Sequence, residues 1–129
     1  MAAYEWLLAN KYQLILVYPE QLPPTTNLEE GLPGLIKLGV WRQGNFRSFT
    51  REESLHADQR IRMLMQQDQY QLLSLDMLRR ESLESRPDGL RLMADEFGAA
   101  ALNRLTIVNP RRLIFDIPDS AEIESSTAA

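Results

Sequence analysis

The sequence predicts an α+β fold: a mainly antiparallel sheet of about four to five strands, with two or three helices packed on one face. Three observations lead to this expectation. Short apolar runs of strand length recur along the chain. Two pairs of such runs flank residues that are typical of hairpin turns. Longer segments carry apolar residues at helical spacing. A helix-dominated fold is the alternative if the hairpins do not form.

Length and composition narrow the possibilities further. The 129 residues suit one domain, which we place at residues 1–117, followed by an acidic, disordered tail over residues 118–129. Cysteine is absent, which excludes disulfides, thiolate metal sites and thiol catalysis. Polar residues interrupt the apolar N-terminal segment well before the ~20 residues that a membrane span needs. We therefore expect a soluble, cytoplasmic protein with no membrane partner.

The chain is predicted to begin with a short helix that leads into a buried strand. The segment "AAYEWLLAN" has Ala, Leu and Glu in an order that favours a helix, and "QLILVY", residues 13–18, is a compact apolar run of strand length. Residues 18–34 then hold four prolines and two glycines. This composition predicts a loop or an extended connector within the domain.

A first hairpin is predicted over residues 35–49, "LIKLGVWRQGNFRSF". Its two-residue turn would be Gly44-Asn45, because a type II′ turn places Gly first. In this register Arg42 faces Arg47 across the hairpin, and Trp41 lies on the other face.

Helices are expected in the middle of the chain. Thr50 and Glu53 form a capping-box pattern in front of "REESLHADQRIRMLMQQ", whose apolar stripe would be Ala57, Ile61, Leu64 and Met65. Residues 70–84 alternate as a strand would, but they also suit a helix that begins at Ser74, and we favour the helix. Residues 87–89, Pro-Asp-Gly, would start the next helix, with a stripe at Leu90, Met93, Phe97 and Ala101.

A second hairpin is predicted over residues 104–118, "RLTIVNPRRLIFDIP". Asn109 and Pro110 suit the first two positions of a type I turn. A three-residue loop would gather the Leu, Ile and Phe side chains on one face, whereas a two-residue loop would place an acid opposite Leu105, so the pattern favours the longer loop. Arg111 and Arg112 would then stand at an exposed tip.

The sequence offers no established catalytic, metal or nucleotide motif. Its single histidine, His56, has Glu52 at helical contact distance, but no nucleophile motif accompanies this pair. The neighbouring acids do not have the spacing of a zinc or calcium site, and the glycines fit neither a dinucleotide-binding motif nor a P-loop. We therefore expect a protein that is not an enzyme and that has no catalytic residue, cofactor or metal.

A protein-interaction role is the function that the sequence favours. The chain would be a self-associating subunit or an accessory factor of a larger assembly, with a protein or a second copy as its partner. Four aromatic residues lie within the first eighteen, and aromatic and Arg side chains are enriched at interface hot spots. Open strand edges would provide a route to a homo-oligomer. The candidate partner-binding residues are Trp6, Trp41, Arg42, Arg47, Arg111 and Arg112.

The alternative is an accessory protein that binds nucleic acid through its Arg-bearing hairpins. Arg42 and Arg47 would repel each other across the first hairpin unless an anion lay between them, and Trp41 could stack on a base. However, the formal net charge is −4 and the pI is near 5.0, whereas a nucleic-acid-binding domain commonly has a pI above ~9. Nucleic acid therefore ranks below a protein partner.

Overall fold

Three short parallel strands form the centre of the fold. The structure is a computed structural model that describes residues 3–51, 54–74 and 82–115. The strands β1 (Ile15–Val17), β2 (Trp41–Asn45) and β3 (Leu72–Ser74) are paired in the order β1-β2-β3, and both pairs are parallel. In the register of the sheet, Ile15 lies beside Trp41, and Gln43 lies beside both Val17 and Leu72.

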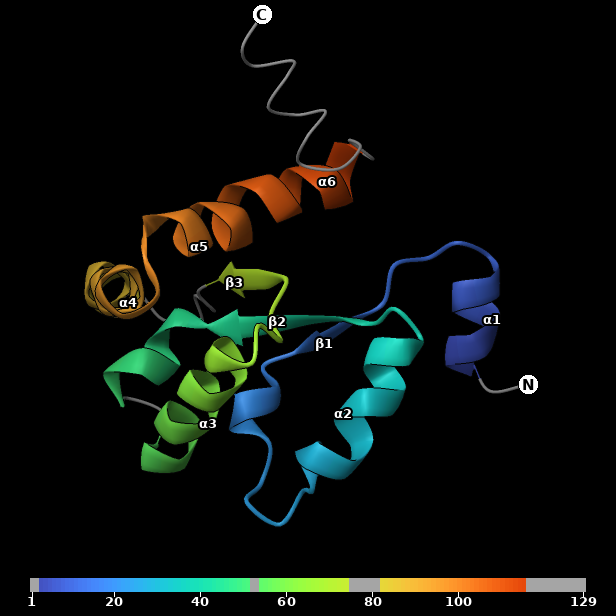
Figure 1. Cartoon of the computed structure of the whole chain (residues 1–129), viewed down its shortest axis with the longest axis horizontal. Coiled ribbons are helices and arrows are strands. Elements are labelled where there is room, and N and C mark those ends of the chain that lie inside the picture. Colours follow the sequence, from blue (N-terminus) through green and yellow to red (C-terminus); the bar gives the residue numbers. More distant parts are fainter. Residues whose placement is uncertain (1–2, 52–53, 75–81, 116–129) are drawn as a thin grey trace, which may run out of the picture.

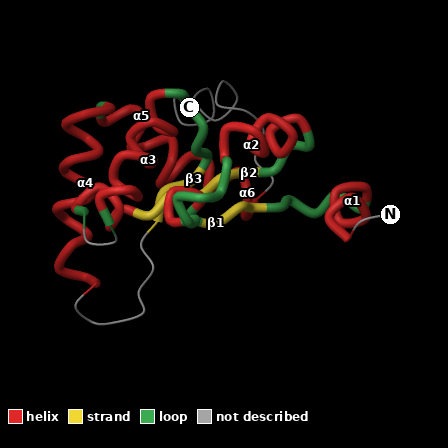
Figure 2. Tube along the Cα trace, turned by 90° about the horizontal axis from the view of Figure 1, so that it is seen from below, coloured by secondary structure: helices red, strands yellow, loops and turns green. Residues whose placement is uncertain are grey.

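Helices cover both faces of this sheet (Figure 1). The crossover helices α2 (Leu28–Lys37) and α3 (Leu55–Gln66) lie on one face, and α5 (Ala99–Asn103) and α6 (Asn109–Phe115) lie on the other. The helix α4 (Ser82–Phe97) closes the end of the sheet where β2 and β3 finish. The short helix α1 (Ala3–Ala9) stands apart from this body in both Figure 1 and Figure 2.

The predicted sheet is therefore wrong, although the chain does combine helices and strands as an α+β fold requires. Instead of an antiparallel sheet of about four to five strands with helices on one face, three parallel strands lie between two layers of helices. Parallel neighbours must be joined by a long crossover, commonly a helix. The helices α2 and α3 provide these crossovers, so consecutive strands never form a hairpin in the described residues.

The first predicted hairpin does not form, because the glycine that was expected in its turn lies inside a strand. Residues 35–37 are the last turn of α2, and Gly44 lies inside β2. A Cβ atom added to Gly44 would stand 2.7 Å from Leu73 Cδ2 and 3.0 Å from Tyr70 Cε1. Gly44 thus permits the close approach of β3 and the segment before it, and the chain does not turn there.

The second predicted hairpin is also wrong, because residues 99–115 are helical throughout. A π-helical turn, η3 (Arg104–Val108), joins α5 to α6. It ends two residues before Pro110, whose missing N–H could not continue a regular helical hydrogen-bond ladder. Leu105 is 1% exposed, and the Asn109 side chain donates a 2.8 Å hydrogen bond to the carbonyl of Gln71. Packing of this face on β3 therefore outweighs the strand propensity of the Thr, Ile and Val residues.

The expected central helices form with different boundaries. The N-cap of α3 is Ser54 and not Thr50, because the Ser54 hydroxyl accepts a 2.9 Å hydrogen bond from the Ala57 N–H. The predicted stripe of α3 is confirmed as buried core: Ala57, Ile61, Leu64 and Met65. The helix predicted from Ser74 does not begin there, because Ser74 ends β3. Residues 75–81 lie outside the described residues, as do Glu52, Glu53 and the tail.

The helix α4 begins at Ser82, five residues before the predicted start at Pro87. Within it, Met93 is fully buried, whereas Gly98, with φ of 91°, separates α4 from α5 and so divides the predicted stripe. The most deeply buried apolar side chains come from η2, α3, α4 and η3, so the core lies between these elements. They include Phe49, Ile61, Met93 and Leu105. The turn η2 (Phe46–Thr50) follows β2 directly.

Candidate interaction surface

The six predicted partner-binding residues do not form one site. Trp6 lies in α1, Trp41 begins β2, and Arg111 and Arg112 lie in α6. All three elements lie on the side of the molecule where β1 and β2 start (Figure 1). Arg42 and Arg47 belong elsewhere, because Arg42 is buried and Arg47 lies in η2, beyond the far end of β2.

Arg42 has a structural environment that sequence reasoning missed. It is 6% exposed, its Nε donates a 2.7 Å hydrogen bond to the carbonyl of Gln69, and its Nη1 donates a 2.6 Å bond to the carbonyl of Val40. Burial lowers the pKa of this guanidinium from its ordinary value. The side chain joins β2 to the turn before β3, and the predicted Arg42–Arg47 pair across a hairpin does not exist.

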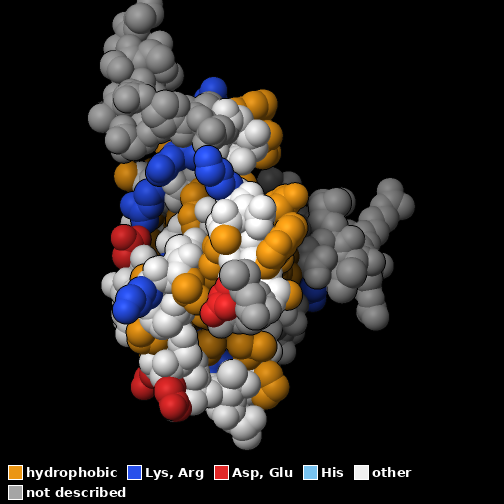
Figure 3. Space-filling view, turned by 90° about the vertical axis from the view of Figure 1, so that its right-hand side faces the viewer, with side chains coloured by type: hydrophobic (Ala, Val, Ile, Leu, Met, Phe, Trp, Pro, Cys, Tyr) orange, Lys and Arg blue, Asp and Glu red, His pale blue; other side chains and the backbone are white. Residues whose placement is uncertain are grey.

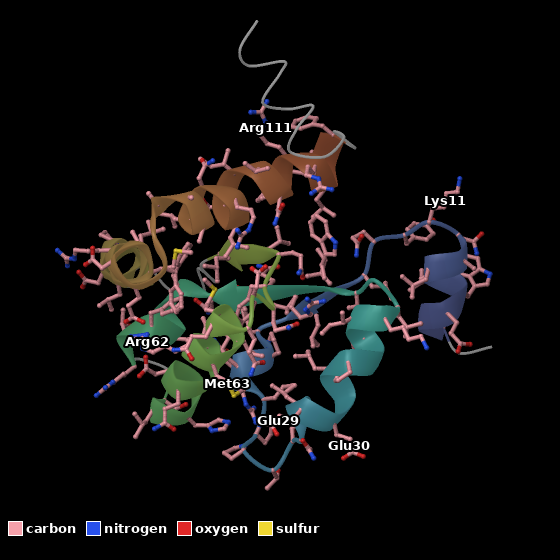
Figure 4. All side chains as sticks on the ribbon, in the orientation of Figure 1. Lys11, Glu29, Glu30, Arg62, Met63 and Arg111 are labelled. Carbon is pink, nitrogen blue, oxygen red and sulfur yellow. The ribbon has the colours of Figure 1, made fainter. Side chains whose placement is uncertain are left out.

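Trp41 and Arg112 line one cavity of about 740 Å³, which we call the Trp41 cavity. Leu8 and Tyr12 reach it from α1 and the following turn, and Leu38 reaches it from the end of α2. Arg112 is half-buried in its wall, whereas Arg111 is exposed and points away from the body (Figure 4). The cavity mixes aromatic, aliphatic and cationic groups.

An apolar groove runs beneath β1 and has a volume of about 540 Å³. The helix α2 packs through its buried residues Leu28 and Leu32 into the core, and this leaves a trough between its other face and β1. We call this trough the β1 groove. Every described residue that lines it is apolar or glycine: Leu14, Ile15, Leu16, Gly31, Gly34, Leu35, Leu38 and Val40. Figure 3 views the molecule from the side on which α1 lies, and it shows hydrophobic side chains across the middle of this face.

The outer edge of β1 is open within the described sheet. The carbonyl of Leu14 accepts a hydrogen bond from Trp41 N–H, and Tyr18 N–H donates to the carbonyl of Gln43. Because alternate residues of a strand direct their backbone groups to the same side, Leu14, Leu16 and Tyr18 face β2. The N–H and C=O groups of Ile15 and Val17 face outwards. Val17 is also 51% exposed, so the edge is apolar as well as unpaired.

A buried carboxyl group lies at the other end of the strands. Tyr18 has a left-handed conformation (φ 54°, ψ 53°) that turns the chain after β1 into η1 (Pro19–Gln21). Glu20 is fully buried there and accepts hydrogen bonds from Asn45 N–H (2.8 Å), the Ser48 hydroxyl (3.2 Å) and the Tyr70 hydroxyl (2.8 Å). Burial raises the pKa of Glu20, and these three donors together with the backbone of Glu20 itself only partly oppose this shift. The buried carboxyl group therefore connects η1 to the end of β2, to η2 and to the segment before β3.

His56, the one candidate for general-base chemistry, lies beside a cavity of about 400 Å³ between α3 and the chain before α2. Arg60 spans this cavity wall and donates hydrogen bonds to the carbonyls of Leu22 (3.0 Å) and Thr26 (3.1 Å). Its guanidinium therefore holds the connector onto α3. In the part of the chain that the structure describes, no three His, Asp or Glu residues are placed to hold a metal ion.

Comparison with known protein families finds no family model that matches the chain, and comparison with curated proteins finds no match. Across residues 3–51, 54–74 and 82–115, no helix combines the length and the apolar character that crossing a bilayer requires. The surface formed by α1, β1 and α2 is the largest apolar feature that carries no structural role within the described fold.

Proposed function

We propose that this chain is a non-enzymatic protein-interaction module that binds its partner through the surface formed by α1, β1 and α2. The observation that carries the proposal is the β1 groove, with about 540 Å³ of space lined only by apolar residues and glycine. Each square ångström of apolar surface exposed to water costs roughly 25 cal/mol. Exposed apolar grooves of this kind mark interaction sites.

The geometry of the surface indicates what would bind there. A groove between a helix and a sheet accepts an apolar helix, and an open strand edge accepts another strand through backbone hydrogen bonds. Both features occur side by side, in β1 and on the face of α2 that carries Gly31 and Gly34. We therefore favour a subunit or accessory factor of an assembly, working in the cytoplasm as the cysteine-free sequence suggests.

The nucleic-acid alternative has little physical support. It depended on two Arg-bearing hairpins, and the corresponding described residues form a crossover, a strand and a continuous helical segment instead. The guanidinium of Arg42 is already bonded to the carbonyls of Val40 and Gln69. A phosphate would have to displace these hydrogen bonds inside the protein.

The proposal can be tested by affinity capture from an extract of the source organism. The baits are the tagged wild-type chain, Gly34→Leu and Lys37→Leu. A Cβ at Gly34 would meet no heavy atom within 4 Å in the described structure, so the larger side chain fits the folded chain and projects into open space at the groove. Lys37→Leu is the matched control, because it adds an exposed Leu to α2 outside the residues that line the groove.

We expect a protein partner, which can be the untagged chain itself, to be retained by the wild type and by Lys37→Leu and to be reduced on Gly34→Leu. Quantitative mass spectrometry of the three eluates measures this difference. Identical retention of every captured protein on all three baits would refute a partner at the β1 groove.

A further inference from the structure

The helix α1 is too short to be stable on its own. It has seven residues, of which only Glu5 is charged, and Trp6 is 53% exposed. Isolated helices shorter than ~12 residues are marginal in water, and most helices in proteins are stabilised by packing of an apolar face. Figures 1 and 2 both show α1 set apart from the sheet. Leu7 and Leu8 are half-buried, so its own chain covers the apolar surface of α1 only in part, and a further surface could bury the remainder.

The turn after α1 holds the helix in this outlying position. Lys11 has a left-handed conformation (φ 65°), and its N–H and that of Tyr12 donate 3.0 Å hydrogen bonds to the carbonyls of Leu8 and Leu7. This is the pattern of a Schellman C-cap. The rings of Trp6 and Tyr12 stack with centroids 6.4 Å apart, across the same turn. Within the described structure, no residue of α1 lines the β1 groove of its own chain.

The β1 groove has the dimensions and the chemistry to receive such a helix. A seven-residue helix is about 10 Å long, and the three residues of β1 span about the same length. Gly31 and Gly34 lie on the α2 wall, where the lack of side chains lets a second helix approach closely. The lining residues carry no charge that an apolar helix would have to neutralise, and Leu35 and Leu38 provide contact area.

We propose that the groove is occupied by α1 of a second copy of this chain, in a reciprocal exchange about a two-fold axis. This inference rests on the proposed function, and it specifies the partner. Five residues, 10–14, separate α1 from β1, and they span at most ~17 Å. A helix seated under β1 of one copy therefore holds the β1 strand of the other copy close to the same edge.

The open edge of β1 is suited to that arrangement. In an antiparallel pair centred on Leu16, Ile15 of each copy lies opposite Val17 of the other. The outward N–H and C=O groups of both residues then form four hydrogen bonds. A second copy thus fills the groove, covers the exposed part of α1 and pairs the strand edge through one symmetric interface. An unrelated partner would have to supply both a helix and a strand, and it would leave the exposed part of α1 in water.

The absence of cysteine makes a cross-linking test direct. Two single-cysteine variants of the full chain are prepared, Ala9→Cys in α1 and Leu35→Cys in the groove. They are mixed, treated with a short bismaleimide and analysed by mass spectrometry. The double variant Ala9→Cys, Leu35→Cys is treated in parallel at high dilution. We expect Ala9→Cys to be joined to Leu35→Cys between chains. A bridge formed only within the diluted double variant would overturn the exchange, because it would place α1 in its own groove.

Sedimentation velocity over a range of concentrations provides the second measurement. We expect the wild type and Lys37→Leu to form a dimer, and Gly34→Leu to weaken it by about 30-fold, which is the loss typical of a disrupted hot spot. Circular dichroism and thermal melting check that Gly34→Leu remains folded. A wild type that stays monomeric at all concentrations overturns the exchange. If the wild type is monomeric but captures a different protein through the groove, the proposed function stands without the exchange. If it is monomeric and no captured protein depends on the groove, both proposals are refuted.

Discussion

The hydroxyl group of Tyr70 donates a 2.8 Å hydrogen bond to Glu20 Oε2, and so joins two residues that are 50 positions apart in the sequence. Glu20 follows β1, and Tyr70 precedes β3. The other carboxyl oxygen of Glu20 accepts hydrogen bonds from the N–H of Asn45, the last residue of β2, and from Ser48 Oγ in η2. One buried carboxyl group therefore links the three strands of the sheet near one end.

Removing the Tyr70 hydroxyl is expected to destabilise the fold. The change Tyr70→Phe leaves Glu20 Oε2 buried without its donor, and an unsatisfied buried polar group costs ~1–3 kcal/mol. Urea unfolding measures the loss in the free energy of unfolding. Tyr12→Phe is the matched control, because Tyr12 is 57% exposed and its hydroxyl removal should change stability by less than ~0.5 kcal/mol. Equal effects of the two changes would show that the Glu20 contact contributes nothing.

The titration of Glu20 predicts how stability depends on pH. Burial raises the pKa of Glu20 in the folded protein above its ordinary value of 4.5, which we take for the unfolded chain. The folded state therefore keeps this proton to a higher pH than the unfolded state does. The contribution of Glu20 to the free energy of unfolding is complete below pH 4.5 and is lost as the pH rises through the folded pKa.

The variant Glu20→Gln tests this sign. Glutamine keeps the size of the side chain and an acceptor oxygen for Asn45 N–H, and the Tyr70 hydroxyl can accept from its amide. Because Gln does not titrate, the stability of the wild type relative to the variant should fall from acidic to neutral pH. Urea unfolding of both proteins at a series of pH values measures this difference. A difference that stays constant or rises with pH would contradict the raised pKa.

Gly89 provides a prediction in which helix propensity and packing oppose each other. Alanine is normally the better helix former by ~1 kcal/mol, but a Cβ atom at Gly89 would stand 2.6 Å from the carbonyl oxygen of Phe46. That atom belongs to the backbone of η2 and cannot move as a flexible side chain would. We expect Gly89→Ala to lower the free energy of unfolding by about 1–3 kcal/mol, as overpacking commonly does.

Gly34→Ala is the control for the change at Gly89. Gly34 also lies within a helix, but a Cβ atom there would meet no heavy atom within 4 Å in the described structure. Under conditions that keep the chain monomeric, this variant should gain ~0.5–1 kcal/mol. Thermal or urea unfolding of both variants gives the comparison. If Gly89→Ala is as stable as Gly34→Ala, then the contact between α4 and η2 is looser than the structure indicates.

Local sequence patterns predicted the elements whose apolar residues face the core and misread those whose turn residues serve packing. The four-residue spacing from Ala57 to Ile61 and Met65 predicted the buried face of α3. The run around Leu16 predicted a strand, but β1 is a half-buried strand at the edge of the sheet and not the buried strand that was expected. Gly44 and the Asn109-Pro110 pair were interpreted as turns. In the fold, Gly44 instead makes room for Leu73 and Tyr70, and Pro110 follows a π-helical turn. Neither role can be read from the neighbouring residues, because Gly44 packs against Leu73 and Tyr70, and Asn109 bonds to the carbonyl of Gln71.

In the candidate surface, too, residue type alone did not distinguish exposed residues from buried ones. Trp41 and Arg112 were selected by residue type, and the fold brings both to the Trp41 cavity. Arg42 was selected by the same criterion and is buried, since only the tertiary structure places the carbonyls of Val40 and Gln69 around it. The glycines that line the β1 groove resembled loop residues in a proline-rich segment. Only the folded structure places them on the exposed side of α2, where they line the β1 groove.

The two sides of β1 allow proline substitutions to separate folding from self-association. Proline lacks the N–H donor and is tolerated on a free strand edge, where that donor would face solvent. The N–H of Val17 faces outwards, so Val17→Pro should keep the fold and weaken the dimer at least ~10-fold through the loss of edge hydrogen bonds. Leu16→Pro, whose lost N–H faces β2, should instead destabilise the monomer. Sedimentation velocity and thermal melting distinguish the two effects. A folded Val17→Pro variant that dimerises as tightly as the wild type would show that the β1 edges do not meet, even if α1 is exchanged.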